Sequence, residues 1–243
     1  EDLYCGDRSI STPAQANKRL LEQLKANRYD LFILAGFNWN AHFTAEVRDA
    51  LTAQVRDGAG ILFIEPDGFN AEDPLAPMMG LAKTRSMWSW ASWKPEGSSP
   101  LTAGLPWDRF PQTRFMDYER WPEGEVQARL SNGKPLLVTN QLGKGRTAAL
   151  TYDVLTHAMS YRGYAGLTPI LSYRGGFLRP EFQEMTWHYW EPWYALLARL
   201  SVWAAGRDTG VRVVSLEPPA EGAKALSLKL EGGKGDYQVS ARF

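Results

Sequence analysis

The chain has few of the residues that build disulfides and metal centres. Its 243 residues include one cysteine and three histidines, so an internal disulfide framework and a multi-cysteine metal site are excluded. His42, His157 and His188 show neither His-x-x-x-His nor His-x-His spacing. Asp153 and His157, at i and i+4, are the pair that could share a zinc ion, which is weak support for such a site. We therefore predict no metal and no cofactor.

The chain also lacks net charge and long apolar runs. Lys+Arg 27 against Asp+Glu 27 gives a formal net charge of +0, which offers no electrostatic footprint for nucleic acid or an acidic membrane. No apolar run approaches the roughly 20 residues of a transmembrane helix. We expect no nucleic-acid partner and no membrane span. The sequence has no initiating Met and no basic, apolar leader, which is typical of a mature or excised segment. The single cysteine does not fix the compartment, and we favour a periplasmic or secreted location over the cytoplasm.

Strand and helix patterns alternate as far as residue 64. Thr12-Pro13-Ala14-Gln15 has the form of a capping box with proline at the first helical position. Alternation with short joints is typical of a doubly wound sheet. The predicted elements are a strand at 3–5, a helix from 13, a strand at 30–36, a helix at 44–57 and a strand at 60–64.

The rest of the chain mixes irregular stretches with further elements. Prolines block long helices from 70 to 115, where we expect an irregular excursion. We predict a hairpin at 135–139 and 146–152, a second irregular stretch at 153–190, and a helix from near Pro192 that buries Leu200 and Trp203. The domain prediction is an α/β domain at 1–207 and a short β-strand segment at 208–243 that opens or attaches to a β domain.

Three segments resemble stretches of the class I glutamine amidotransferase-like superfamily. They are SSPLTAGLP (98–106), KPLLVTNQLGKGRTAALTYD (134–153) and HYWEPWYALLARLSVWAAGR (188–207). The likeness covers about residues 3 to 207 and is nearest to the non-glutaminase branch, found in uncharacterised multidomain bacterial proteins and in the trimerisation domain of bacterial β-galactosidases. It implies a flavodoxin-like three-layer α/β/α sandwich with a mostly parallel sheet.

The resemblance also predicts that glutaminase chemistry is lost. True amidotransferases carry a Gly-x-Cys-x-Gly elbow after a central strand, and a His and a Glu near the C-terminus. The matching elbow here is Ile64-Glu65-Pro66-Asp67-Gly68, while His188 and Glu191 fall near the other two positions. A carboxylate cannot form the thioester that glutamine hydrolysis requires. We predict a non-catalytic structural and interaction module of a larger, carbohydrate-related bacterial protein, with other domains or identical subunits as its partners.

Polar residues at the predicted strand ends leave an alternative open. Ligands of open α/β sheets bind outside the carboxyl ends of the strands. A carboxylate-based hydrolase acting on a sugar-like substrate would find its acid and base there. Each residue also has a structural explanation as a turn cap, a backbone partner or a loop histidine. The candidates are Glu65, Asp67, Asp153 and His157 for catalysis, and Asn38, Trp39 and Asn40 for ligand binding.

Aromatic residues are abundant, with ten Trp, ten Tyr and ten Phe. In MWSWASW (87–93) an extended strand places Trp88 and Trp90 on one face, which makes them candidates for an exposed stacking surface for carbohydrate or a partner. In WHYWEPWY (187–194) Trp193 belongs to the apolar stripe of the last helix, which favours core packing.

Overall fold

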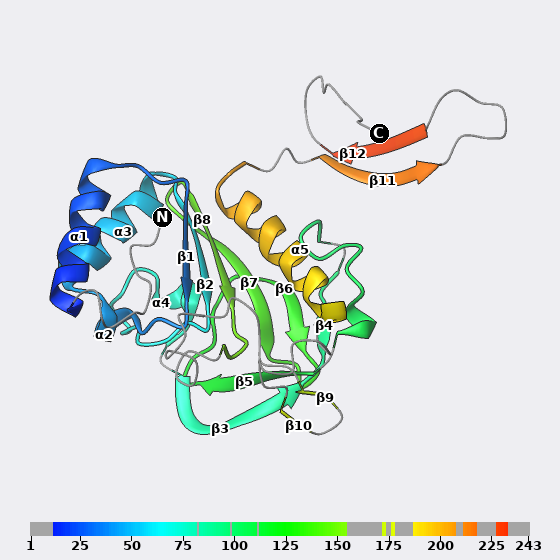
Figure 1. Ribbon diagram of the computed structural model, residues 1–243, viewed down its shortest axis with the longest axis horizontal. Helices are drawn as coiled ribbons and strands as arrows, with labels where there is room; N and C mark the ends of the chain where they lie inside the picture. The colour runs from blue at the N-terminus through cyan, green and yellow to red at the C-terminus, as the bar shows by residue number, and fades with distance from the viewer. Residues whose placement is uncertain are drawn as a thin grey trace. The chain divides into compact units, whose positions relative to one another are not determined.

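The chain divides into two compact units, Glu1–Gly206 and Arg207–Phe243. The first contains a six-stranded sheet with helices, and the second contains an antiparallel pair of strands (Figure 1). The computed structural model describes residues 12–81, 83–97, 99–110, 112–154, 172–173, 176–177, 187–207, 211–217 and 227–232. The strand predicted at 3–5 lies outside these residues.

The six-stranded sheet is mixed. β1, β2 and β8 pair in parallel, whereas β7 pairs antiparallel with β8 and β6, and β6 pairs antiparallel with β4. An α/β fold is confirmed, but the described strands are not mostly parallel, because β6, β7 and β8 follow one another through tight turns that reverse the chain. In spatial order the strands are β1 (Leu31–Ala35), β2 (Gly60–Ile64), β8 (Gly145–Leu150), β7 (Pro135–Leu142), β6 (Glu125–Leu130) and β4 (Trp93–Pro95).

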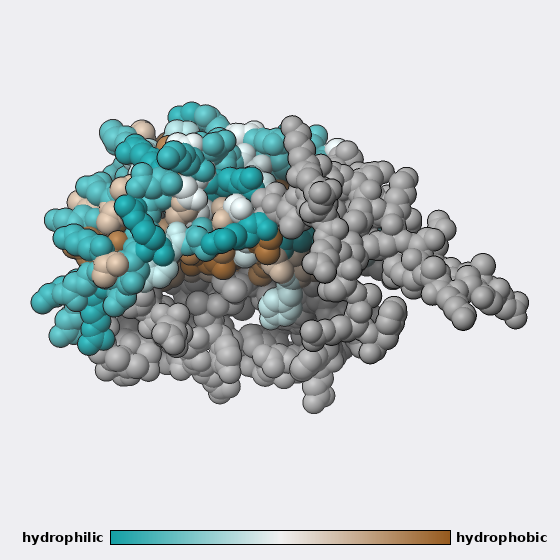
Figure 2. Space-filling view, turned by 90° about the horizontal axis from the view of Figure 1, so that it is seen from above, coloured by the Kyte–Doolittle hydropathy of each residue, from teal (hydrophilic) through white to brown (hydrophobic). Residues whose placement is uncertain are grey.

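Local sequence signals set the first helices as predicted. α1 (Pro13–Ala26) begins at the Thr12 capping box, and α3 (Ala45–Asp57) begins at Thr44 and ends at Gly58. The exposed side of α1 carries charged residues. The left side of Figure 2, where α1 lies, is mostly hydrophilic. The short helices α2 (Trp39–His42) and α4 (Ala76–Met79) lie on the connections that follow β1 and β2.

The two faces of the sheet bury different helices. Successive residues of a strand point to opposite faces, so Ile61 and Phe63 of β2 join one core cluster while Leu62 and Ile64 join the other. The first cluster contains residues of α1 and α3, and the second contains residues of α5 (Trp187–Ala204). α1 and α3 therefore cover one face of the sheet and α5 covers the other (Figure 1).

The last helix differs from its prediction at both ends of its apolar face. α5 begins at Trp187, so Pro192 lies inside it rather than at its start. Leu200 is fully buried as expected. Trp203 is only partly buried, and the Arg146 guanidinium carbon lies 5.4 Å from its ring centroid. Trp203 therefore lies at the rim of the core.

Among the described residues, no helix is sufficiently long and apolar to span a bilayer.

A strand ribbon runs through the region that the sequence predicts to be irregular. β3 (Lys83–Ala91) pairs antiparallel with β5 (Thr113–Tyr118), and the 3-10 helix η1 (Trp107–Arg109) lies between them in the chain. The prediction of an irregular excursion is wrong for these strands and for β4. Pro95 is compatible with β4 because β4 is an edge strand, where a missing N–H is tolerated. Figure 1 shows the ribbon crossing the sheet near the carboxyl ends of β1, β2 and β8.

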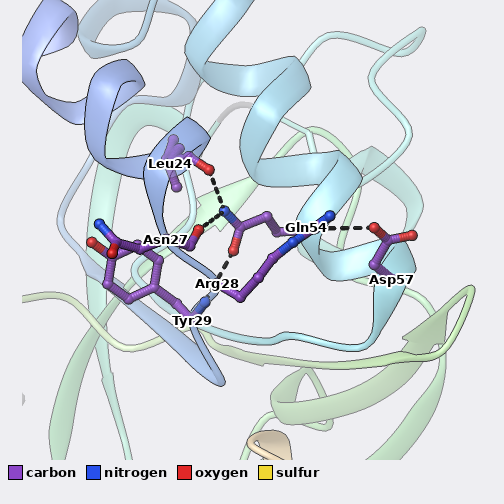
Figure 3. Close-up of polar contacts among 6 residues, drawn as sticks. All are labelled: Leu24, Asn27, Arg28, Tyr29, Gln54 and Asp57. Carbon is purple, nitrogen blue, oxygen red and sulfur yellow. Dashed lines mark hydrogen bonds and ion pairs between the residues drawn. The ribbon is translucent and has the colours of Figure 1, made fainter.

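A buried glutamine connects the end of α1 to α3. Gln54 is 5% exposed, and its Nε2 donates to the carbonyls of Leu24 at 2.7 Å and Asn27 at 2.9 Å, while its Oε1 accepts from Tyr29 N at 3.1 Å (Figure 3). The last carbonyls of a helix have no partner within that helix. Gln54 therefore caps α1 from its neighbour and fixes the path of the chain into β1.

Two glycines allow helix ends to touch the amino ends of strands. A Cβ on Gly60 would lie 2.2 Å from Ala204 O of α5, and one on Gly145 would lie 2.0 Å from Val55 O of α3. Both distances are far below van der Waals contact, so only glycine fits. At the amino ends of β2 and β8, α5 therefore packs closely on one face of the sheet and α3 on the other.

The second unit consists, in its described residues, of β11 (Val211–Glu217) and β12 (Ser227–Gly232). The two strands pair antiparallel with an irregularity between Val213 and Ser215. Two strands are at best marginally stable alone in water.

Candidate functional site

The bend after β2 has an unusual backbone conformation at Glu65. Among the described non-glycine residues, Glu65 alone has a positive φ, at 57°, a conformation that costs L residues about 1–3 kcal/mol. Its N–H donates to Leu150 O of β8 at 2.8 Å. Its carboxylate Oε2 accepts from Val154 N at 2.9 Å. These two bonds hold the strained residue against β8 and the segment that follows it.

The carboxylate of Glu65 is buried, with 3% of the residue exposed. A buried carboxylate requires hydrogen-bond partners, and the Val154 N–H supplies one. Glu65 therefore connects the end of β2 to Val154, which follows β8.

The loops after β1 and β2 are bonded to each other through Asn38 and Asp67. Asn38 caps α2, with its Oδ1 accepting from Ala41 N at 2.9 Å, and its Nδ2 donates to Asp67 Oδ2 at 3.3 Å. Gly68 has φ 74°, and a Cβ there would lie 2.0 Å from Asn38 Oδ1. The side chains of Asn38 and Asp67 are partly buried and are more exposed than Glu65, which is buried.

Trp39 packs in the core. It is 1% exposed, its ring stacks on Phe69 with centroids 5.1 Å apart, and Phe43 meets it edge-on. The predicted stacking surface is therefore not presented to solvent, because the α2 turn that Asn38 caps points the ring inward. Asn40 donates from Nδ2 to Gly68 O and shares the partly buried loop.

Asp153 lies at the end of β8 and pairs with β5. Its Oδ2 is 2.6 Å from Arg114 Nε, with both side chains largely buried, and its N–H donates to Arg114 O at 2.9 Å. Phe115 of β5 also forms a bridge with Tyr152. β5 is thus fixed across the carboxyl end of β8.

Tyr118 lies at the other end of β5 and is also buried. The residue is 5% exposed, and its ring meets Trp121 edge-on at 4.9 Å. Its hydroxyl has no hydrogen-bond partner in the part of the chain that the structure describes. Burial raises the pKa of Tyr118 well above its ordinary value, and the negative charges of Glu65, Asp67 and Asp153 raise it further.

Four predicted residues come together at this edge, and others do not. Asn38, Glu65, Asp67 and Asp153 meet at the carboxyl ends of β1, β2 and β8. His157 lies outside the described residues. We use the name strand-end cluster for Glu65, Asp67, Tyr118 and Asp153.

The aromatic and helical candidates lie elsewhere. Trp88 and Trp90 both belong to β3, as predicted; Trp90 is partly buried, and the side chain of Trp88 lies outside the described structure. His188 and Glu191 are positions of α5 whose side chains are also outside it.

Arg114 and Tyr118 were not predicted as site residues. Both belong to β5, within or next to the stretch expected to be irregular. The run Thr113–Tyr118 (TRFMDY) does not alternate strictly between apolar and polar residues, so it gives little strand signal and no indication of which edge of the sheet the strand crosses. No group of three or more His, Cys, Asp or Glu side chains suited to a metal ion occurs among the described residues.

No protein-family model and no curated sequence matches the chain. Solved structures do match. A ThuA-like protein from Parabacteroides merdae is 18% identical, with a TM-score of 0.49 over 83% of this chain and 78% of that one. A cytoplasmic protein from Salmonella typhimurium LT2 is 17% identical, with a TM-score of 0.46 over 74% of this chain and 75% of that one. The β-galactosidase of the psychrophilic Marinomonas ef1 is 16% identical, with a TM-score of 0.32, and the match covers 76% of this chain and 23% of that one.

These similarities concern the fold. All three have identities below 25% and TM-scores below 0.5, so they carry no argument about the family or the function of this chain. Membership of the amidotransferase-like superfamily is therefore a proposal that rests on the residues of the chain itself.

Proposed function

We propose that the first unit is a non-catalytic amidotransferase-like module of a larger bacterial protein. The observation that carries the proposal is the elbow after β2, which retains the left-handed backbone at Glu65 while its buried carboxylate accepts a backbone hydrogen bond from Val154. An elbow normally exposes its nucleophile above the strand ends. Here the same turn holds two strand ends together.

The position of β5 supports a structural role. An architectural domain is expected to fill the region outside its strand ends, and in the described residues β5 does so with Arg114 and Tyr118. Both catalytic candidates on β2 and β8 already have structural partners, Glu65 with Val154 and Asp153 with Arg114. Their bonds explain their burial without invoking a reaction.

We also propose the finer architecture, a flavodoxin-like three-layer sandwich over residues 1–207 followed by a β segment at 208–243 that attaches to a β domain. Helices on both faces of the sheet and the two strands of the second unit support it. Other domains of a longer chain or identical subunits are the proposed partners. The carbohydrate-related setting comes from the resemblance of the sequence segments.

The test measures turnover and stability together. We expect no ammonia release from glutamine and no release of reducing sugar from a panel of oligosaccharides. Glu65→Gln keeps an acceptor for the Val154 N–H, whereas Glu65→Leu removes it, so the Leu variant should lose about 1–3 kcal/mol more stability. Turnover by the native chain that is lost in Glu65→Gln would refute the non-catalytic role.

A carboxylate-based hydrolase acting on a sugar-like substrate is the second candidate. It is favoured by two buried carboxylates, Glu65 and Asp153, whose charges both act on the hydroxyl of Tyr118. Pairs of acidic groups in unlike environments are the usual acid and base of glycoside hydrolysis. Glu65 with Asp67, or Asp153 with His157, would take these roles. Sugar release abolished by Glu65→Gln would select the first pair, and release abolished by Asp153→Asn would select the second, provided that the variant still folds.

A further inference from the structure

β1 lies at one edge of the six-stranded sheet and lacks the features that protect natural edges. Its five residues, Leu31–Ala35, are all apolar and pair with β2 in unbroken register. No strand in the described part of the chain pairs with its outer side. Natural edge strands are short, charged, bulged or interrupted by proline, because an open apolar edge pairs readily with other extended chains. β4, at the opposite edge, has three residues that include Lys94 and Pro95.

Alternate residues of β1 direct their backbone groups to this outer edge. At one end of the pairing with β2, Gly36 N donates to Ile64 O at 2.9 Å. At the other end, Asp30 O accepts from Gly60 N at 2.8 Å. Even-numbered residues therefore bond to β2, and the odd-numbered residues between them direct N–H and C=O groups outward. These are Leu31, Ile33 and Ala35. Ile33, in the middle, is also 42% exposed, so the edge can accept one more strand.

The handedness of strand–helix–strand connections indicates which segment belongs at this edge. α1 precedes β1, and α3 lies between β1 and β2 in the chain. Both helices cover the same face of the sheet (Figure 1). Crossovers between parallel strands are almost always right-handed, so two consecutive crossovers on one face advance across the sheet in the same direction. A strand that precedes α1 therefore belongs beside β1, on the side away from β2.

The start of α1 is fixed near the carboxyl end of β1. Asn17 donates from Nδ2 to His42 O at 2.9 Å, and its Oδ1 accepts from Thr44 N at 2.9 Å. His42 and Thr44 belong to the connection that follows β1. The chain therefore enters α1 from the edge where the parallel strands end. Residues 1–11 precede the Thr12 cap and belong to the first unit, and they are sufficient for a short strand and a joint.

We propose that Leu3-Tyr4-Cys5 adds to the outer edge of β1 as a parallel strand. The side chains of such a strand would cover Ile33, because neighbouring strands place side chains of one face next to each other. The parallel direction would bring Cys5 and Asp7 to the carboxyl ends of the strands, next to the loop that contains Asn38. The inference goes beyond the proposed function, because it adds residues to the strand ends whether or not the unit has chemistry.

Amide hydrogen exchange of the full chain, followed residue by residue by NMR, tests this placement. The Ile33 N–H points away from β2, so an added strand should slow its exchange by about 100-fold or more relative to an unstructured peptide. Phe32 and Leu34 are internal controls, because their N–H groups point to β2 and should be protected with or without the added strand. Ile33 exchange close to that of an unstructured peptide would overturn the proposal, and this measurement requires no variant to fold.

Proline variants identify the occupant of the edge. Successive N–H groups of a strand point to opposite sides, so either Leu3→Pro or Tyr4→Pro removes a donor to β1. In that variant Ile33 should exchange about tenfold faster or more, whereas exchange at Phe32 and Leu34 should change much less.

Two further results would contradict the assignment of this edge. One is unchanged Ile33 exchange in both proline variants. The other is Ile33 protection that rises with protein concentration, together with a dimer in size-exclusion chromatography with light scattering, which would assign the edge to a second copy of the chain. Neither result depends on turnover, so the proposed function is tested separately.

Discussion

Replacing Gln54 by methionine should destabilise the first unit by about 2–4 kcal/mol. Methionine has nearly the volume of glutamine, so the change removes hydrogen bonds without opening a cavity. Three backbone groups lose their partner, the carbonyls of Leu24 and Asn27 and the N–H of Tyr29. The bond to Leu24 is buried and should account for about 1–3 kcal/mol, whereas water can partly replace the other two.

Urea denaturation followed by Trp fluorescence measures this loss, with amide hydrogen exchange at Tyr29 as a local readout. Arg28→Ala is the matched control, because the Arg28–Asp57 ion pair lies beside Gln54 but is exposed (Figure 3), and such pairs contribute little. We expect a loss below about 0.5 kcal/mol for the control. A Gln54→Met loss below about 1 kcal/mol, or one no larger than that of Arg28→Ala, would show that Gln54 does not cap α1.

Four further outcomes are expected. Leu200→Ala should lower the free energy of unfolding, measured by urea denaturation, by about 2–5 kcal/mol, because Leu200 is fully buried. Trp203→Ala should lower it by less than the roughly 3–5 kcal/mol of a fully buried Trp, because Trp203 is only partly buried. A Trp203→Ala loss that reaches this range would contradict the placement of Trp203 at the rim of the core. Gly68→Ala should lower the thermal midpoint, since its Cβ would meet the Asn38 amide, and an unchanged midpoint would refute the clash. The pKa of Tyr118 is raised on folding, so the Tyr118 contribution to stability should be complete below about pH 10 and should fall at higher pH, because only the unfolded chain releases the proton there. Comparing the alkaline denaturation midpoints of the native chain and Tyr118→Phe tests this direction. The purified chain should release no ammonia from glutamine, and release that persists after affinity and size-exclusion steps would refute the loss of the nucleophile.

Local signals in the sequence were sufficient for the elements that depend on neighbouring residues. Thr12 and Thr44 start helices through bonds to residues three positions away, and such caps are legible in any sequence. The hairpin of β7 and β8 is equally local, with Gly143 and Lys144 between the paired Leu142 and Gly145. These predictions were confirmed.

Long-range pairing was not legible. β3 and β5 are separated by a segment rich in proline, and their partnership depends on contacts that no local period records. For the same reason Arg114 and Tyr118 could not be assigned to the strand ends. The antiparallel pairing of β4 with β6 also makes the sheet mixed, and apolar runs alone indicate only that strands are buried.

The candidate site was predictable where topology decides position. Asn38, Glu65, Asp67 and Asp153 follow strands whose carboxyl ends share one edge, so the general rule for α/β sheets brings them together. Trp39 follows the same strand, but it enters a short helix that turns its ring onto Phe69. Strand order predicts where a residue arrives, and side-chain direction depends on the next turn of the chain.

The glycines at the amino ends of the strands divide the first unit into a part that tolerates change and a part that does not. At Gly60 and Gly145 the backbones of strand and helix are too close for any added carbon, so a saturation library should return glycine almost alone at both positions. At the carboxyl ends Gly68 is limited in the same way, but the turn that follows it is exposed. Peptides grafted between Asn70 and Asp73, in the exposed turn after β2, should leave the sheet intact, so this turn can be redesigned while the amino ends of the strands stay unchanged.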